Sequence, residues 1–249
     1  MSIFIKSEKE IAGIRKAGEI LALSLERIEP YLREGITTKE ISDIIEDFIR
    51  SHNARPVFKG YRGFPAPVCI SVNEVVVHGI PDNRRLKEGD IVGIDIGVEK
   101  NGFIADAART FGIGELKPEV RRLLEVTEKA LYRGIEAAKE GNRVSDISHA
   151  IQSCVESAGF SIVEELTGHG VGLRLHEEPM IPNFGPPHRG ARLVSGMTLA
   201  IEPMVNMGGK EVKTLKDGWT VVTRDGLPSA HFEHTVLVDK DSPVILTRS

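Results

Sequence analysis

The sequence predicts a mixed α/β (α+β) fold made of two related halves, in which each half is a helical stretch followed by a β-hairpin. Three observations predict it: capped helices with apolar residues at helical spacing, a strand-turn-strand pattern near residue 100, and a short internal repeat. The helices are expected to be scaffold, and the strands carry the residues of chemical interest.

The first helix is predicted to begin at Ser7. Ser7 to Glu10 form a capping box, and apolar residues follow it at helical spacing. These residues are Ile11, Ile14, Leu21, Leu25 and Ile28. Gly35 is expected to end this helix, and a second capping box from Thr37 to Glu40 predicts the start of the next one.

A β-hairpin is predicted after the second helix. Residues 91 to 98 alternate as in a strand, with apolar side chains on one face and Asp95 between two glycines on the other. The Asn-Gly pair that follows is a strong signal for a two-residue turn. With that turn, Gly97 faces Asp106 and Asp95 faces Ala108, so the two acids lie diagonally on one face, about 7–8 Å apart. The alternative is a hairpin with two solvated acids on its exposed side.

A short internal repeat relates the two halves of the chain. The matched positions, at offsets of 106 or 107 residues, are Gly35 with Gly141, Ser42 with Ser148, Gly89 with Gly196, and Asp95 with Glu202. Asp106 then corresponds to Glu233 across a longer insertion. Unless the match is a coincidence, it brings four carboxylates towards one pseudo-twofold axis. The expected organisation is one domain, residues 1–249, built from halves at about 1–113 and 114–249.

A histidine flanked by glycines completes the candidate ligand set. His169 lies in a glycine cluster where the backbone can approach a site closely, although such a histidine is more often structural. Four acids that interrupt apolar strands need pairing or cations if they are buried. Two divalent ions balance their charge, and a neutral imidazole adds a ligand without adding charge. The predicted metal ligands are Asp95, Asp106, His169, Glu202 and Glu233.

The composition excludes several classes of protein. The 32 Lys plus Arg and 36 Asp plus Glu give a formal net charge of −4 without any basic run, so neither nucleic-acid nor membrane binding is expected. Cys69 and Cys154 do not make a disulfide scaffold, which favours a reduced, cytoplasmic protein. The sequence shows no signal segment and no apolar run of roughly 18 residues. We expect a monomer.

Five blocks of the sequence resemble those of type I methionine aminopeptidases, namely residues 69–79, 89–111, 168–179, 197–205 and 231–235. The similarity runs over nearly the whole chain and keeps the five candidate ligands in order and spacing. It implies the pita-bread fold, in which two pseudo-twofold halves form a curved antiparallel sheet flanked by helices. A dinuclear metal site would lie on the concave face of that sheet.

The resemblance also implies roles for the ligands. Asp95 would bind one ion, Asp106 and Glu233 would bridge both, and His169 and Glu202 would complete the shell of the other ion. Carboxylate and imidazole ligands suit two divalent ions among Co, Mn, Fe and Zn. The implied catalytic residues are His78, His176 and Glu202, with Glu202 in proton transfer and the histidines near the scissile bond.

A pocket for the substrate side chain is implied as well. The family pattern points to Tyr61, Phe64, Cys69 and Trp219, together with His78 and His176, and adds Leu175 and Phe58 as further candidates. Aromatic rings and a thiol suit a flexible thioether. The alternative for these apolar residues is ordinary core.

The implied activity is hydrolytic removal of the initiator methionine from nascent proteins with a small second residue, by attack of a metal-bridging hydroxide. The partners would be nascent polypeptide N-termini close to the ribosome. One alternative is a prolidase or Xaa-Pro aminopeptidase, which uses a similar ligand set but usually carries an extra N-terminal domain. The other is a non-catalytic pita-bread protein that binds peptides, and the presence of all five ligands argues against it.

Overall fold

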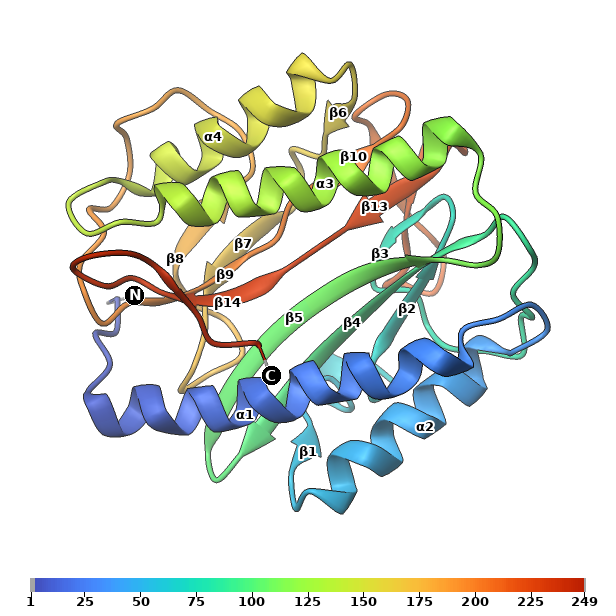
Figure 1. Cartoon of the computed structure of the whole chain (residues 1–249), viewed down its shortest axis with the longest axis horizontal. Helices are drawn as coiled ribbons and strands as arrows, with labels where there is room; N and C mark the ends of the chain where they lie inside the picture. The colour runs from blue at the N-terminus through green and yellow to red at the C-terminus, as the bar shows by residue number, and fades with distance from the viewer. Residues whose placement is uncertain (1–2, 249) are drawn as a thin grey trace.

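The computed structural model describes residues 3–248, drawn in Figure 1. The helices are α1 (Glu8–Ile28), α2 (Thr38–Ser51), α3 (Pro118–Ala137) and α4 (Val144–Ser157), with 3-10 turns η1 (Glu29–Tyr31) and η2 (Tyr61–Gly63). The strands of the first half are β1 (Arg55–Pro56), β2 (Cys69–Val72), β3 (Val75–Val77), β4 (Ile91–Lys100) and β5 (Phe103–Gly112). Those of the second half are β6 (Ser161–Ile162), β7 (Thr167–Gly170), β8 (Glu177–Pro182), β9 (Thr198–Ile201), β10 (Met204–Asn206), β11 (Val212–Thr214), β12 (Val221–Thr223), β13 (Ser229–His231), β14 (His234–Leu237) and β15 (Val244–Ile245).

The starts of α1 and α2 are confirmed. The backbone N–H of Ser7 donates to Glu10 Oε2 over 2.7 Å, and that of Thr37 donates to Glu40 Oε2 over 2.8 Å, so both capping boxes form. The predicted end of α1 at Gly35 is wrong, because the α-helix stops at Ile28 and passes into the turn η1. Pro30 in that turn lacks a backbone N–H and cannot extend the α-helical ladder.

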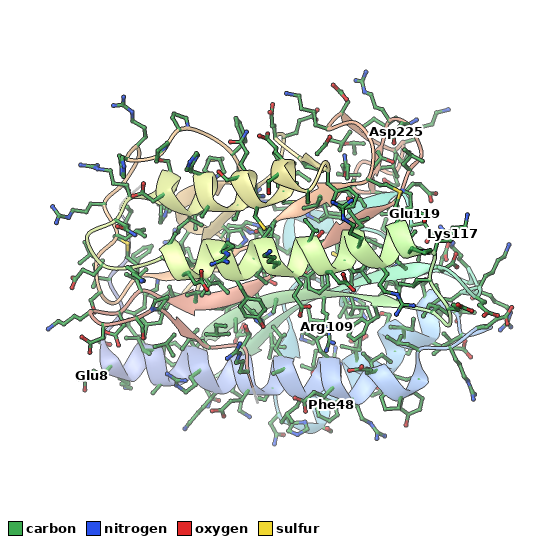
Figure 2. All side chains as sticks on the ribbon, turned by 45° about the horizontal axis from the view of Figure 1, so that its top comes forward. Glu8, Phe48, Arg109, Lys117, Glu119 and Asp225 are labelled. Atoms are coloured by element: carbon green, nitrogen blue, oxygen red, sulfur yellow. The ribbon has the colours of Figure 1, made fainter. Side chains whose placement is uncertain are left out.

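The β4–β5 hairpin has the predicted register. Gly97 is paired with Asp106, and Asp95 is paired with Ala108. Strand β4 also pairs with β1 and β2, which gives a four-stranded antiparallel sheet. Arg109, the next residue after Ala108, points to the helix-covered side between α1 and α3 (Figure 2). Asp106 therefore faces the opposite side of the sheet, because side chains alternate along a strand.

The positions matched by the internal repeat form matching hydrogen bonds. Gly35, with a φ of 88°, donates its N–H to the carbonyl of Leu86 over 2.8 Å, and Gly141, with a φ of 91°, donates to the carbonyl of Leu193 over 3.0 Å. A positive φ is a conformation that glycine adopts without strain. The repeat therefore reflects equivalent turns between the two helices of each half, each hydrogen-bonded to the segment that precedes β4 or β9.

Two apolar cores lie between the helices and the strands. In the first, α1 and α2 pack on β2, β4 and β5, with Ile94 and Ile96 fully buried among the side chains of these elements. In the second, α3 and α4 pack on the strands of the second half, around Leu131, Ile151 and Leu199. Figure 1 shows α1 with α2 along one side of the molecule and α3 with α4 along the other. The helices thus cover one face of the strands and leave the face with Asp95 free of helices.

The halves meet where β5 runs beside the segment between β13 and β14 (Figure 1). Glu233 donates its N–H to the carbonyl of Ala108 over 2.9 Å, and the N–H of Ala108 points back at the carbonyl of Glu233 at 3.4 Å. Among residues 3–248, none of the helices has the length and apolar character needed to cross a bilayer.

Candidate metal centre and substrate pocket

A pocket of about 290 Å³ opens on the helix-free face of the strands. All the residues singled out from the sequence line it, although they are spread over 176 positions of the chain, from Phe58 to Glu233. The predicted ligands in its wall are Asp95, Asp106, His169, Glu202 and Glu233. The other predicted residues in its wall are Phe58, Tyr61, Phe64, Cys69, His78, Leu175, His176 and Trp219.

The ligand atoms gather at the polar end of this pocket. Ligand atoms of Asp106, His169 and Glu233 all lie within 4.8 Å of one another, and these three residues are buried. The Nε2 atom of His169 is 3.4 Å from Oε1 of Glu202 and 4.0 Å from Oδ2 of Asp106. Asp95 lies diagonally across the hairpin from Asp106 and lines the same pocket. One small volume is thus surrounded by carboxylate oxygens and one ring nitrogen.

The tautomer of His169 shows which of its ring nitrogens is free to bind a cation. Nδ1 of His169 lies 2.9 Å from the carbonyl oxygen of Gly170, which can only accept, so Nδ1 carries the proton. Burial lowers the pKa of His169 to about 4, so the ring is neutral near pH 7. Its Nε2 lone pair therefore faces carboxylate oxygens. A cation bound between them would satisfy both the lone pair and the carboxylate oxygens.

The pKa values and hydrogen bonding of the carboxylates also indicate a cation site. Burial raises the pKa of Asp95 to about 7, and burial together with neighbouring carboxylates raises the pKa of Asp106 and Glu233 well above the ordinary value. Burial and the charge of Asp95 also raise the pKa of Glu202. Within residues 3–248, Oδ1 of both aspartates and Oε1 of Glu233 are buried side-chain oxygens without a hydrogen-bond partner. Oxygen donors that lack both partners and countercharge fit divalent cations.

The backbone around the acids explains why they converge. The Asp106 N–H donates to Thr235 Oγ1 over 2.9 Å, and this hydroxyl donates to the carbonyl of Asp106 over 2.7 Å. This exchange fixes β5 against β14 beside Glu233. On the neighbouring strands, the acid of the second half interrupts the ladder, because β9 ends at Ile201 and β10 begins only at Met204. Pro203 has no N–H for the ladder, and Asn183 Nδ2 instead donates to the freed Glu202 carbonyl over 3.0 Å.

His78 and His176 reach the pocket from two segments that are far apart in the chain. His78 has a φ of 58°, an uncommon conformation for a residue with a Cβ, and it precedes Gly79, where a Cβ would lie 2.1 Å from the carbonyl oxygen of Ile70. The ring of His176 lies 4.2 Å from that of His169, centroid to centroid, and its Nδ1 is 2.9 Å from the Tyr61 hydroxyl. Burial lowers the pKa of both histidines, that of His176 to about 3, so both are neutral hydrogen-bonding groups.

The other end of the pocket is apolar. Phe64 and Trp219 meet edge to face with ring centroids 5.2 Å apart, and Cys69 and Leu175 belong to the same apolar cluster. Burial and the nearby carboxylates raise the pKa of the Cys69 thiol, so it acts as a small neutral wall group and not as a thiolate. These side chains form the wall of a cavity and do not fill a closed core.

The structure also identifies residues that the sequence did not single out. His231 is buried, and its Nε2 lies 3.9 Å from Oε2 of Glu202 and 3.9 Å from Oε2 of Glu233, without a hydrogen-bond partner. The available signal was its position two residues before Glu233, on the same side of an extended segment. The pocket wall further includes Leu166, Met180 and Met204, whose apolar character gives no hint of a binding role in the sequence.

Comparison with known proteins agrees with this geometry. The chain matches metallopeptidase family M24 over residues 12–240. It is 54% identical to the methionine aminopeptidase of Clostridium perfringens, over 98% of both chains, and 52% identical to methionine aminopeptidase 1 of Bacillus subtilis, over 99% of both. The crystal structure of the methionine aminopeptidase from Thermotoga maritima superposes with a TM-score of 0.98 at 43% identity, over the whole of both chains. The family and the pita-bread fold expected from the sequence are therefore confirmed, and the chain belongs to metallopeptidase family M24, among the methionine aminopeptidases.

Proposed function

We propose that this protein is a metal-dependent aminopeptidase that removes the initiator methionine from nascent proteins, with preference for a small second residue. The observation that carries the proposal is the composition of one pocket, in which a cluster of buried carboxylates and His169 opens directly onto aromatic and sulfur-containing walls. Such a pocket combines a cation-binding site with an adjacent site for an apolar side chain. Full-length similarity to methionine aminopeptidases supports the same activity.

We propose two divalent ions, among Co, Mn, Fe and Zn, as the cofactor. Asp95 would hold one ion, Asp106 and Glu233 would be shared by both, and His169 with Glu202 would complete the set of direct ligands of the other ion. When bound, such ions supply Lewis-acid activation of the peptide carbonyl and of water. The charge of four carboxylates matches that of two divalent ions, which explains how so many acids are tolerated in a buried site.

Glu202 is proposed to move the proton during hydrolysis. In the metal-free protein, burial and the charge of Asp95 raise the pKa of the Glu202 carboxyl group. In the loaded enzyme, Glu202 would accept a proton at Oε1 or Oε2 and deliver it to the departing amine. The Nε2 atoms of His169 and His231 lie 3.4 Å and 3.9 Å from its two oxygens, so both rings border this carboxylate.

His78 and His176 are proposed to bind the peptide at the scissile bond. The contact between His176 Nδ1 and the Tyr61 hydroxyl fixes the ring and leaves Nε2 to face the substrate. Because the ring is neutral, Nε2 can donate a hydrogen bond to the oxygen on which charge develops without repelling the cations beside it. His78 would make the corresponding contact from the opposite side.

The apolar end of the pocket would hold the methionine side chain. Tyr61, Phe64, Cys69 and Trp219 present ring edges and a thiol, which pack well on a thioether. Residues 1–249 would act as one catalytic domain of two related halves, about 1–113 and 114–249. We propose a cytoplasmic monomer whose partners are nascent polypeptide N-termini close to the ribosome, without nucleic-acid or membrane binding of its own.

The test compares Met-Ala-Ser with Ala-Pro-Ser as substrates. Metal-stripped protein is assayed alone and after restoration of Mn, Fe, Co or Zn, and the released amino acid is quantified. The proposal predicts that Met-Ala-Ser releases methionine only after metal addition and that Ala-Pro-Ser stays intact. Preferential cleavage before proline would identify a prolidase-like peptidase, and failure to cleave either peptide with every metal would favour a peptide-binding protein.

A further inference from the structure

A buried ion pair lies next to the catalytic pocket but outside its lining. Lys6 Nζ donates to Glu177 Oε2 over 2.5 Å, and the two side chains are only 1% and 0% exposed. The two residues are 171 positions apart in the chain. Lys6 comes from the segment just before α1, and Glu177 is the first residue of β8. Neither takes part in the mechanism proposed above.

The second oxygen of this carboxylate organises the loop next to the site. Glu177 Oε1 accepts the backbone N–H of Leu173 over 2.7 Å and that of Arg174 over 2.8 Å. Together with Lys6, these three donors satisfy a carboxylate that would otherwise be costly to bury. Two backbone amides of the loop between β7 and β8 are therefore bound by the side chain of Glu177, which directly follows His176.

This loop ties His176 to the metal-binding strand. β7 contains His169, the loop carries Leu175 and His176, and β8 begins at Glu177. The His176 ring is already in contact with the rings of His169 and Tyr61. A small movement of the loop backbone would shift His176 relative to both. Displacements of about 1 Å at a catalytic group cost roughly a hundredfold in rate.

Lys6 is itself held in place by several contacts. Its N–H donates to the carbonyl of Gly196 over 2.8 Å. Its stem packs on the loop, because a Cβ built on Gly172 would lie 3.1 Å from Lys6 Cε. The ring of Phe4 lies 5.8 Å from Lys6 Nζ and 5.8 Å from the guanidinium of Arg174, so the same segment contacts the loop twice. The N-terminal segment thus packs against the 171–177 loop.

We propose that Lys6 is a positioning residue for His176, acting through the carboxylate of Glu177 and the 171–177 loop. The proposal rests on the proposed aminopeptidase function for its kinetic readout. An ion pair that served only stability could be replaced by apolar groups without penalty, since buried ion pairs often add little net stability. The geometry favours a directional role, because one carboxylate links the lysine to two amides of the loop that carries His176.

A double-mutant cycle tests this role with Mn-loaded protein and Met-Ala-Ser. Lys6→Met is expected to lower kcat by about ten- to a hundredfold, with little change in KM or bound manganese. In a His176→Ala background, the same change is expected to cost less than about twofold, because the residue it positions is gone. Lys6→Arg, which keeps the positive charge, should retain most of the wild-type kcat. Lys9→Met, an exposed position on α1, is the matched control and should behave as wild type.

Two outcomes would overturn the proposal. One is that the effects of Lys6→Met and His176→Ala multiply, which would indicate a general loss of structure. The other is that Lys6→Met matches Lys9→Met. Should Lys6→Met fail to fold, Glu177→Gln replaces it in the cycle, because it keeps an oxygen for the two loop amides but removes the charge that pairs with Lys6.

A readout independent of turnover separates this proposal from the proposed function. The ring protons of His176 lie against two other rings, so their NMR shifts in zinc-loaded protein report the position of the imidazole. Lys6→Met is expected to move these signals and Lys9→Met is not; unchanged signals in Lys6→Met would contradict the positioning role. If the wild-type protein releases no methionine, the aminopeptidase assignment fails while this measurement still decides the role of Lys6.

Discussion

The Nε2 atom of His169 lies 3.4 Å from Oε1 of Glu202, and the proton of the imidazole is engaged on the other side of the ring by the carbonyl of Gly170. Two electron-rich atoms therefore face each other inside a buried pocket. A cation bound between them would satisfy both the lone pair and the carboxylate. The arrangement therefore fits a site for divalent cations.

Removal of the proposed bridging carboxylate of Asp106 should strongly weaken metal binding. Asp106→Asn keeps the size of the side chain but removes its charge, and Asp106 belongs to the compact group of ligand atoms. Because changes outside the direct ligands already cost about 10–100-fold, a direct ligand should cost at least roughly a hundredfold in metal affinity and in kcat. Metal content by mass spectrometry checks this. Asp43→Asn, at an exposed i,i+4 pair on α2, is the control, and equal metal content in both variants would contradict the assignment.

Metal binding should release protons, and more of them at low pH. In the metal-free protein, burial raises the pKa of Asp95 to about 7 and raises that of Asp106 and Glu233 well above the ordinary value. Below these pKa values the carboxylates hold protons that cations must displace, so metal affinity should rise with pH through neutrality. His169 contributes no proton there, because its pKa is lowered to about 4. Calorimetry in two buffers with different ionisation enthalpies counts the protons. More protons should be released at pH 6 than at pH 8, and the same number at both would refute the expectation.

His231 should tune the centre without being one of the five predicted ligands. Its buried Nε2 faces the carboxylates of Glu202 and Glu233 at 3.9 Å each. His231→Leu removes this polar neighbour and should weaken metal affinity about 10–100-fold, whereas His231→Gln should retain most of it by keeping a donor. The control is His149→Leu, an exposed position on α4. Calorimetric titration with manganese measures the affinity, and identical values for His231→Leu and wild type would exclude this role.

Trp219 should contribute to recognition of methionine and not to metal binding. It meets Phe64 edge to face at 5.2 Å, so Trp219→Ala opens the apolar wall of the pocket. Aromatic pairs of this kind contribute about 0.5–1.5 kcal/mol beyond their buried area, so KM for Met-Ala-Ser should rise at least several-fold at constant metal content. Leu215→Ala, an exposed side chain in the neighbouring turn, is the control. A changed metal content together with an unchanged KM would contradict the assignment.

Local sequence signals were sufficient for the first half of the site. The register that sets Gly97 opposite Asp106 follows from the turn alone, because a two-residue turn fixes the partners on both strands. The capping boxes at Ser7 and Thr37 were equally local, since their hydrogen bonds join residues three positions apart. Such features depend on neighbours in the sequence and can be predicted from them.

Features that depend on distant contacts could not be predicted in this way. The interruption of the strand at Glu202 is satisfied by Asn183, and the loop beside His176 is held by Lys6, 171 residues away from Glu177 in the chain. His231 gave only a weak signal, because its role depends on where Glu202 arrives from another strand. The early end of α1 shows a different limit, since the prediction used Gly35 alone and the helix already ends before Pro30.

The central claim is that five side chains from distant segments hold a pair of divalent cations, and anomalous diffraction from crystals of the manganese-loaded protein tests it most directly. The account predicts two anomalous peaks about 3.5–4 Å apart, each within bonding distance of carboxylate oxygens. The residues in contact with the two peaks should be Asp95, Asp106, His169, Glu202 and Glu233. Anomalous density elsewhere in the molecule, or ions in the pocket without contact to His169 and Glu233, would contradict the account.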